Sequence, residues 1–376
     1  MTDVLLVAEQ LRRSVPGGIG TYIRGLLQGF DDLVSAGEDV PDLTLYASRP
    51  RNRHQGPSSG TDSYSSGSDS LTTWRRPVRV SPLPSALLTR GWDSGALDVP
   101  RAFPVVHAPS LATPPCRHAR LVVAVHDTAW RHVPEVYSRR GRTWHEAALR
   151  RAVHRASAVV VPAEAVAADA VAAGFDPDQV HVVALGSDHL PLPDAAGAAA
   201  VLRHFGIDGP FLLSVGTLEP RKNLGRLFEA YNRARSSLPG PWPLVVVGPA
   251  GWGKEPSVPI SPGIMMTGAV SDAILAALYG RATLLAYVPL VEGFGLPPLE
   301  AMAAGAPVVA SPMPSIGEAA WVVDPTDVDA IAGGLAEVAS DDELRARLSA
   351  AGRARAGSHR WADSARRHLA VWEAGG

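Results

Sequence analysis

The chain has 376 residues, which is long enough for two domains of ordinary size, each with its own core. With 35 Lys and Arg against 37 Asp and Glu, the net charge of −2 gives no overall basic field and argues against nucleic acid as a partner. No apolar run approaches the roughly 20 residues that span a bilayer, and a single cysteine excludes an internal disulfide. We therefore expect a cytoplasmic protein.

Short apolar runs alternate with longer helical patterns along the chain, which is typical of parallel α/β layers. The strands predicted in the first half are 4–8, 43–46, 104–107, 121–125, 158–161 and 180–183. Those predicted in the second half are 211–215, 244–248, 264–267, 283–288, 307–310 and 321–323. Between the two sets lies a segment with prolines, a glycine and an alanine run but no strand pattern, and we predict that this segment, 191–203, is the interdomain linker.

This organisation predicts two Rossmann-like domains, residues 1–190 and 204–356. The last stretch, 357–376, carries Trp361, Ala365, Leu369 and Trp372 at the spacing of one helical face, and it is predicted to be a helix that packs on a domain, with a return across the first domain as one option. Residues 51–70 are too rich in Ser and Gly to bury a core and are predicted to be a flexible surface loop. Ligands of open parallel sheets bind beyond the carboxyl ends of the strands, so we expect the functional residues on loops that follow strands, around a cleft between the domains.

Two candidate sites follow strands in the first half. Gly17-Gly18-Ile19-Gly20 comes after the first strand and opens a helix that contains Tyr22. These glycines would let the backbone approach a ligand closely, although a turn that needs positive φ explains them equally well. His126 follows the strand 121–125, where its imidazole would hydrogen-bond a sugar hydroxyl or a phosphate. A structural role is the commoner one for a lone histidine.

A basic loop follows the first strand of the second half. Arg221 and Lys222 come immediately before a helix that has Leu224, Leu227, Phe228 and Tyr231 on one face. Cations are unfavourable at a helix start, where the dipole prefers anions, and a bound diphosphate would remove that conflict. The alternative is a solvated basic loop.

Two glutamates flank a glycine-containing turn in Glu292-Gly293-Phe294-Gly295-Leu296-Pro297-Pro298-Leu299-Glu300. The stretch follows the predicted strand 283–288, and Pro297-Pro298 suits the first turn of a helix that ends at Gly305. The backbone N–H groups of such a turn converge at a helix N-terminus, which favours an anion. Each glutamate also has a plainer interpretation, Glu300 as a complement to its helix dipole and Glu292 as a surface residue.

The second half of the chain strongly resembles the GT-B glycosyltransferases of the large retaining family four, which includes bacterial mannosyltransferases. The matching stretches are 216–223, 247–249, 267–272, 292–305 and 307–310. The first half is similar more loosely, through Gly17–Gly20, 108–111 and His126-Asp127. The resemblance departs at Thr217, where many members have an arginine for the diphosphate.

The resemblance implies a role for each matching residue. Glu300 would bind the ribose, Glu292 and the amides of 293–296 the donor sugar, Lys222 the diphosphate, and the loop 267–270 the base. We therefore predict His126, Lys222 and Glu292 as the catalytic residues and assign Tyr22 to the acceptor. The predicted donor-binding residues are Gly18, Thr217, Arg221, Lys222, Val270, Gly293, Phe294, Gly295, Leu296 and Glu300.

The function that follows is a retaining transfer of a sugar, mannose from GDP-mannose by similarity, from a nucleotide diphosphate sugar to a hydroxyl of a glycan, lipid-linked or small-molecule acceptor. The resemblance implies no metal and no other cofactor. The alternatives are a phosphorylase, which would need a lysine such as Lys254 for pyridoxal phosphate, a nucleotide-sugar epimerase, and a non-catalytic partner of another transferase. The Arg-rich stretch 138–155 would fit a peripheral contact with the inner face of an anionic membrane, although a solvated helix face is the commoner interpretation.

Overall fold

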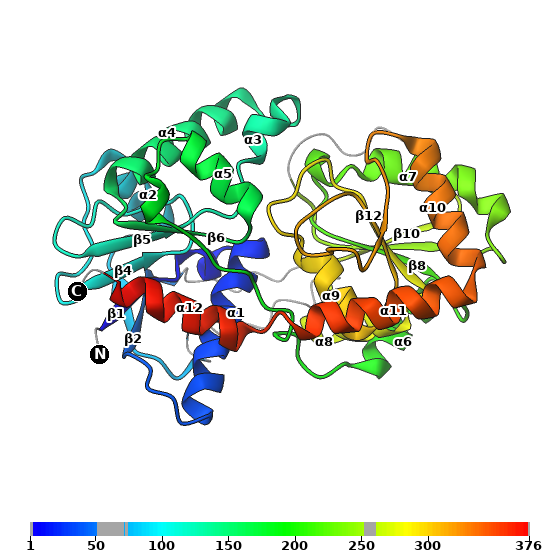
Figure 1. Cartoon of the computed structure of the whole chain (residues 1–376), viewed down its shortest axis with the longest axis horizontal. Coiled ribbons are helices and arrows are strands. Elements are labelled where there is room, and N and C mark those ends of the chain that lie inside the picture. The colour runs from blue at the N-terminus through cyan, green and yellow to red at the C-terminus, as the bar shows by residue number, and fades with distance from the viewer. Residues whose placement is uncertain (1–2, 51–70, 72–73, 252–260, 375–376) are drawn as a thin grey trace, which may run out of the picture. The chain divides into compact units, whose positions relative to one another are not determined.

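The structure is a computed structural model that describes residues 3–50, 71, 74–251 and 261–374. The predicted loop 51–70 and Lys254 lie outside these residues. The chain divides into two compact units, each containing one parallel sheet (Figure 1). The first unit consists of Met1–Thr128, Arg139–Gly186 and Trp361–Gly376, and the second of Ala129–Ser138 and Ser187–Arg360.

The first unit contains a seven-stranded parallel sheet in which the strands follow the order β3-β2-β1-β4-β5-β6-β7. The inner strand β1 pairs on both sides, so that Val4 lies opposite both Leu43 and Val105. Such strands are buried on both faces, which explains why they are continuous apolar runs rather than alternating ones. Their bounds are β1 Val4–Val7, β2 Leu43–Ser48, β3 Val78–Ser81, β4 Val105–Ala108, β5 Arg120–Ala124, β6 Ala158–Val161 and β7 Val180–Val182.

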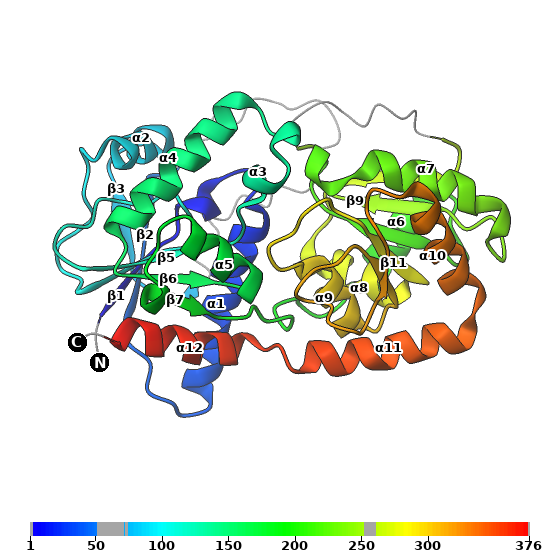
Figure 2. The same cartoon turned by 45° about the horizontal axis from the view of Figure 1, so that its top comes forward.

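Helices cover both faces of this sheet. On one side of β1 the sheet continues with β2, and on the other side it continues with β4, β5, β6 and β7. Because the crossovers between parallel strands are right-handed, helices that follow opposite directions of strand order cover opposite faces. The helix α1 therefore lies on one face, and α4 and α5 lie on the other (Figure 2). The helices of this unit are α1 Gly17–Ser35, α2 Ser85–Ser94, α4 Arg139–Arg155, α5 Glu164–Ala172 and α12 Trp361–Glu373.

The C-terminal helix α12 packs against α1 in the first unit (Figure 1). Trp361 is fully buried there, over Gly25 and Gly29 of α1. A Cβ on Gly25 would lie 2.0 Å from Cε2 of Trp361, and one on Gly29 would lie 2.2 Å from its carbonyl oxygen. The two glycines are one helical turn apart, so they leave a groove along α1 that Trp361 fills, with its indole over Gly25 and its backbone over Gly29.

The second unit contains a six-stranded parallel sheet with the order β10-β9-β8-β11-β12-β13. The strands are β8 Leu212–Val215, β9 Leu244–Val247, β10 Ile264–Gly268, β11 Leu284–Tyr287, β12 Val308–Ala310 and β13 Trp321–Val322. The helices are α3 Ala129–His132, α6 Ala195–His204, α7 Leu224–Ala234, α8 Asp272–Arg281, α9 Leu296–Ala304, α10 Val328–Ser340 and α11 Asp342–Gly357.

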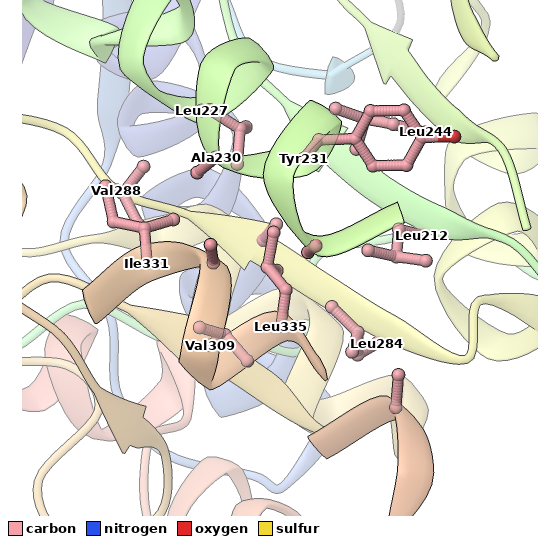
Figure 3. Close-up of a cluster of buried hydrophobic side chains, with 14 of the residues drawn as sticks. Leu212, Leu227, Ala230, Tyr231, Leu244, Leu284, Val288, Val309, Ile331 and Leu335 are labelled. Carbon is pink, nitrogen blue, oxygen red and sulfur yellow. The ribbon is translucent and has the colours of Figure 1, made fainter. Parts of the chain in front are cut away.

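The core of this unit lies between its sheet and the helices α7 and α10 (Figure 3). Leu227 and Tyr231 of α7 and Leu335 of α10 meet the strand residues Leu212 and Leu284, and all five side chains are buried. The apolar face predicted for 224–231 is therefore the face that packs on the sheet.

The two parallel sheets confirm the predicted α/β fold class, and each predicted strand corresponds to an observed one. The strand β3 was not predicted, because it lies at the edge of its sheet, where Arg79 and Val80 are exposed and no apolar run results.

The stretch expected to be a linker, 191–203, contains most of the helix α6. Its alanine run favours a helix, and Asp194 caps it by accepting a hydrogen bond from Gly197 N. None of the helices in the described residues is long and apolar enough to cross a membrane.

Candidate active site

A cluster of polar and charged side chains lies where two neighbouring strands of the second unit end. β8 and β11 are paired in parallel, so the loops that follow them emerge at the same edge of the sheet. The loop after β8 leads into a short 3-10 turn, Pro220–Lys222, which carries Arg221 and Lys222. The loop after β11 carries Glu292, and Tyr287 is the last residue of β11. We refer to Arg221, Lys222, Tyr287 and Glu292 as the Lys222 cluster.

Glu292 is the shared acceptor of the Lys222 cluster. Its Oε2 accepts hydrogen bonds from Arg221 Nη1 at 2.9 Å, from Lys222 Nζ at 2.9 Å and from the Tyr287 hydroxyl at 3.0 Å. The side chain is only 14% exposed. Burial alone would raise the pKa of this carboxyl, but the positive charges of Arg221 and Lys222 outweigh it and hold the pKa at about 2. Glu292 is therefore ionised throughout the neutral range.

The two cations beside the start of α7 are neutralised by the chain itself. Arg221 donates to Glu219 Oε1 at 2.9 Å from Nη2 in addition to its bond with Glu292. Lys222 donates to Glu292 and, at 2.6 Å, to the Tyr287 hydroxyl. Two glutamates thus balance two cations, and the unfavourable position near the helix dipole is relieved without a phosphate. The position near the helix dipole alone therefore does not require a phosphate, and the two cations lie together as predicted.

Asn223 locks the basic turn to the loop after β11. Its φ of 60° lies in the left-handed region, which Asn tolerates better than most residues. Its side-chain amide donates to the carbonyls of Val288 at 3.0 Å and Pro325 at 2.7 Å. Leu290 N also donates to the Arg221 carbonyl at 3.0 Å. The Lys222 cluster therefore rests on a rigid backbone frame.

The glycine-containing turn 293–296 opens the helix α9 as predicted. Gly295 has a φ of 100°, and a Cβ there would lie 2.4 Å from Met313 Sδ, so only glycine fits. Pro297 and Pro298 occupy the first helical turn and have no N–H group. The predicted donors, the amides of 293–296, all come before these prolines. Gly293, Phe294 and Gly295 are buried, and Leu296 is partly exposed.

Glu300 is held in the interior of the second unit. It is 7% exposed, and its Oε2 accepts a hydrogen bond from the Tyr279 hydroxyl at 2.8 Å. His189 Nε2 lies 3.0 Å from Oε1. His189 and Tyr279 were both missed, as were Glu219 and Tyr287. Two of them could have been found from the sequence: His189 lies in the loop that follows the predicted strand 180–183, and Tyr287 lies at the carboxyl end of the predicted strand 283–288.

Thr217 and Val270 lie at the same sheet edge as the Lys222 cluster. Thr217 follows β8, and Val270 comes between β10 and Ser271, the N-cap of α8. Both are partly exposed. Within the second unit, the parallel sheet thus brings loops that carry Thr217, Arg221, Lys222, Val270 and Glu292 to one edge, as the sequence predicted.

In the first unit, His126 follows β5 as predicted. Its Nε2 lies 2.9 Å from the carbonyl oxygen of Pro109. A carbonyl can only accept, so Nε2 carries the proton and the lone pair is on Nδ1. Burial lowers the pKa of His126, although the bond to Pro109 and the charge of Asp127 act in the opposite direction.

The structure separates the roles of the early glycines. Gly17 has a φ of 60°, so the turn interpretation applies to it. Gly18 lies exposed in the first turn of α1, and a Cβ there would have no atom within 4 Å, so packing does not require its glycine. Tyr22, the residue predicted to bind the acceptor, is only 1% exposed, and its hydroxyl is hydrogen-bonded to two histidines. It has no free surface for an acceptor, and we assign it to the interior of the first unit instead.

Among the described residues, no group of three or more His, Cys, Asp or Glu side chains is arranged to hold a metal ion. The charges that face one another in the Lys222 cluster belong to ammonium, guanidinium and carboxylate groups. Such a set suits the binding of a diphosphate and of sugar hydroxyls.

Both halves of the chain match known protein families. Residues 17–186 match the family model described as a glycosyl transferase 4-like domain, and residues 204–355 match the model described as glycosyl transferases group 1. The chain is 29% identical over 270 residues to the O-antigen chain mannosyltransferase B of Escherichia coli, covering 68% of this chain and 71% of that protein. It is 32% identical over 209 residues to a phosphatidyl-myo-inositol mannosyltransferase of Mycobacterium tuberculosis, covering 50% of this chain and 55% of that protein.

Among solved structures, Anabaena Alr3699/HepE in complex with UDP and glucose has a TM-score of 0.71 to this chain. The identity is 18%, and 99% of each chain is covered. At this level of identity the similarity shows that the fold is shared.

Proposed function

The chain belongs to the family 4-like GT-B glycosyltransferases and is an enzyme of this kind, and from this premise we propose that it transfers mannose from GDP-mannose to an acceptor hydroxyl with retention of configuration. The observation that carries the proposal is the Lys222 cluster, in which a lysine, an arginine and an ionised glutamate meet at the carboxyl ends of β8 and β11. The relatives named as mannosyltransferases support mannose as the sugar.

Each part of the donor has a proposed partner in the second unit. Lys222 and Arg221 bind the diphosphate, and Glu292 with the amides of 293–296 binds hydroxyls of the sugar. Glu300 binds the ribose, held in place by Tyr279 and His189. Thr217 and Val270 flank the nucleotide.

Two residues of the first unit complete the proposed set. His126 contacts the donor sugar near the reacting carbon, and its Nδ1 accepts a hydrogen bond from a hydroxyl. Gly18 lies near the phosphates, where the absence of a side chain would allow a close approach of the backbone.

Catalysis in this proposal is mainly electrostatic. The bond between the anomeric carbon and the diphosphate oxygen breaks, and Lys222 and Arg221 stabilise the charge that develops on the departing diphosphate. The acceptor oxygen bonds to the same carbon on the same face, and its proton passes to the departing phosphate oxygen. Glu292 and Glu300 serve donor binding and are not a facing acid and base pair of the glycosidase type. The proposed reaction uses no metal and no other cofactor.

The cheapest test is a thermal-shift panel with GDP-mannose and the UDP, ADP and TDP sugars, in wild type and in Lys222→Ala. A ligand that binds only the folded state raises the Tm by mass action. We expect GDP-mannose to give the largest shift, and Lys222→Ala to lose it. A larger shift with a UDP sugar would replace the proposed donor, and a shift that persists in Lys222→Ala would remove the lysine from the site.

We propose a cytoplasmic enzyme of polysaccharide biosynthesis whose acceptor is a glycan, a lipid-linked molecule or a small molecule. Arg139, Arg140, Arg142 and Arg150 of α4 are exposed, and so is the ring of Trp144. Such a face fits a peripheral contact with anionic lipid. Co-sedimentation tests this contact. We expect more protein to sediment with vesicles of phosphatidylglycerol and phosphatidylcholine than with vesicles of phosphatidylcholine alone. Equal amounts of sedimented protein would favour a solvated helix face.

A further inference from the structure

A network of four hydrogen bonds in the first unit joins three elements that are distant in the sequence. Tyr22 of α1 lies between His107 of β4 and His368 of α12, with its hydroxyl 2.8 Å from His107 Nε2 and 2.7 Å from His368 Nε2. Trp372 Nε1 lies 3.4 Å from His107 Nδ1, and His368 Nδ1 lies 2.7 Å from the carbonyl oxygen of Ser364. Tyr22, His107 and His368 are all buried.

The partners at the two ends fix every proton in this network. An indole N–H can only donate, so His107 accepts at Nδ1 and carries its proton on Nε2, which donates to the Tyr22 oxygen. A carbonyl can only accept, so His368 donates from Nδ1 and accepts the Tyr22 proton at Nε2. The hydrogen bonds therefore run in one direction, from Trp372 through Tyr22 to Ser364, and they are all satisfied only when both histidines are neutral.

This network is in contact with His126. The rings of Tyr22 and His126 meet edge to face, with their centroids 4.8 Å apart and their planes at 73°. His126 is therefore fixed twice, by its hydrogen bond to the Pro109 carbonyl and by the Tyr22 ring. The Tyr22 ring is in turn fixed at its hydroxyl by histidines from β4 and α12.

We propose that Tyr22, His107 and His368 form a positioning network that holds the His126 imidazole in one orientation and one tautomer. A residue of the C-terminal helix, His368, thereby acts on a residue 242 positions earlier in the chain. The consequence for catalysis rests on the proposed role of His126, whereas the effect on the His126 ring does not. The titratable groups around the network are the three histidines, Tyr22 itself and Asp127, which adjoins His126.

The direct test is nuclear magnetic resonance of the full chain with its histidine rings labelled with ¹⁵N. Long-range nitrogen–proton couplings identify which ring nitrogen carries the proton. We expect His126 in the wild type to be a single neutral tautomer protonated at Nε2. Tyr22→Phe keeps the ring but removes the hydroxyl, so we expect His126 to show a mixture of tautomers and a displaced pH titration.

Two further variants separate positioning from general loss of packing. Gln at position 368 can still accept the Tyr22 proton, whereas Leu cannot, so His368→Gln should keep the wild-type His126 signal and His368→Leu should lose it. Tyr231→Phe is the matched control, because Tyr231 is a fully buried tyrosine of the second unit whose hydroxyl donates to the Trp242 carbonyl at 2.8 Å. It should lower the Tm and leave His126 unchanged.

The kinetic counterpart is the release of GDP from GDP-mannose. We expect kcat to fall about 10- to 100-fold in Tyr22→Phe and His368→Leu, since a small misplacement of a reacting group has this effect, with the affinity for GDP unchanged. Unchanged His126 signals in both variants would overturn the positioning network. A His126→Ala variant that keeps its kcat would instead remove His126 from the proposed mechanism, and the resonance measurement would still decide whether the network holds its ring.

Discussion

Each unit buries a polar cluster, and the two clusters are built in opposite ways. In the second unit, the Lys222 cluster consists of full charges, with one carboxylate oxygen of Glu292 shared among two cations and a hydroxyl. In the first unit, the network around Tyr22 consists of neutral groups, joined by four hydrogen bonds that run in one direction. One cluster is held by charge and the other by the directions of its hydrogen bonds.

The difference indicates what each cluster can do. A charged pair can exchange partners, because a diphosphate can take the place of a carboxylate beside Lys222 at little electrostatic cost. A chain of neutral hydrogen bonds has no such exchange, since any proton added or removed leaves two donors or two acceptors facing each other. We therefore expect the charged cluster to bind ligand and the neutral network to hold geometry.

The largest effect is expected from breaking the charged cluster at Glu292. Glu292→Gln keeps the shape but leaves Arg221 and Lys222 without their shared carboxylate. Removing one partner of a buried ion pair costs about 3 kcal/mol or more, and we expect the release of GDP from GDP-mannose to fall at least about 100-fold. Urea unfolding and steady-state kinetics measure the two effects.

The matched control is Glu229→Gln in the same unit. Glu229 pairs with Arg233 at 2.6 Å, but its side chain is 47% exposed, and exposed pairs contribute about 0.5 kcal/mol. It should leave both stability and turnover nearly unchanged. Equal losses in the two variants would show that burial is not what distinguishes the Lys222 cluster.

Acid should act on the two clusters in different pH windows. Burial lowers the pKa of His368 from its usual 6.5 to about 4, so between these values the unfolded chain binds a proton that the folded chain does not. Stability therefore falls as the pH drops from 6.5 to 4, by roughly 3 kcal/mol for this group. For Glu292 the pKa falls from 4.5 to about 2, so its contribution is lost only between those values.

The measurement is the urea midpoint between pH 7.5 and 4.5 in wild type and in His368→Gln, which has no proton to gain. The wild-type midpoint should fall across this range, and that of the variant should fall less. Parallel curves would show that His368 does not carry the acid sensitivity. The Glu292 window lies below this range, and other buried histidines titrate equally in both proteins, so the difference between the two curves reports on His368.

The charged cluster was largely predictable from the sequence, because Arg221, Lys222 and Glu292 follow predicted strands and a parallel sheet brings such loops to one edge. What could not be predicted is the pairing itself. Two cations near a helix start suggested an external anion, whereas Glu219 and Glu292 supply the negative charge. Charge balance depends on side-chain distances, which strand order alone does not give.

The neutral network was not predictable in the same way. Tyr22 is in a helix, His107 in a buried strand and His368 in a helix 346 positions after Tyr22, and no local pattern connects them. The sequence did indicate that the last helix has an apolar face and gave a return to the first domain as one option, but it did not indicate that this face packs on α1. The glycines of α1 were informative only together with the indole that covers them.

Besides the variants of Tyr22 and His368, a substitution in the groove of α1 perturbs the first unit alone. Gly25→Ala places a methyl group where Trp361 Cε2 would be only 2.0 Å away, so the indole or the helix must shift. Such overpacking costs about 1–3 kcal/mol, and because α12 carries His368, we expect the His126 ring signal to change as well. Thermal unfolding and the ¹⁵N spectrum measure both; a lower Tm with an unchanged spectrum would uncouple α12 from His126.

The smallest expected effect has the opposite sign and comes from the second unit. Gly333 lies in the interior of α10, is exposed, and has no atom within 4 Å of the position a Cβ would take. Because Ala restricts the unfolded chain more than Gly does, Gly333→Ala should raise stability by about 0.5–1 kcal/mol and leave activity unchanged. Gly25→Ala and Gly333→Ala are the same chemical change in two helices, so opposite shifts of the Tm would isolate the contact with Trp361 as the cause. A fall of the Tm in both variants would mean that helix packing in the two units is equally intolerant of a methyl group.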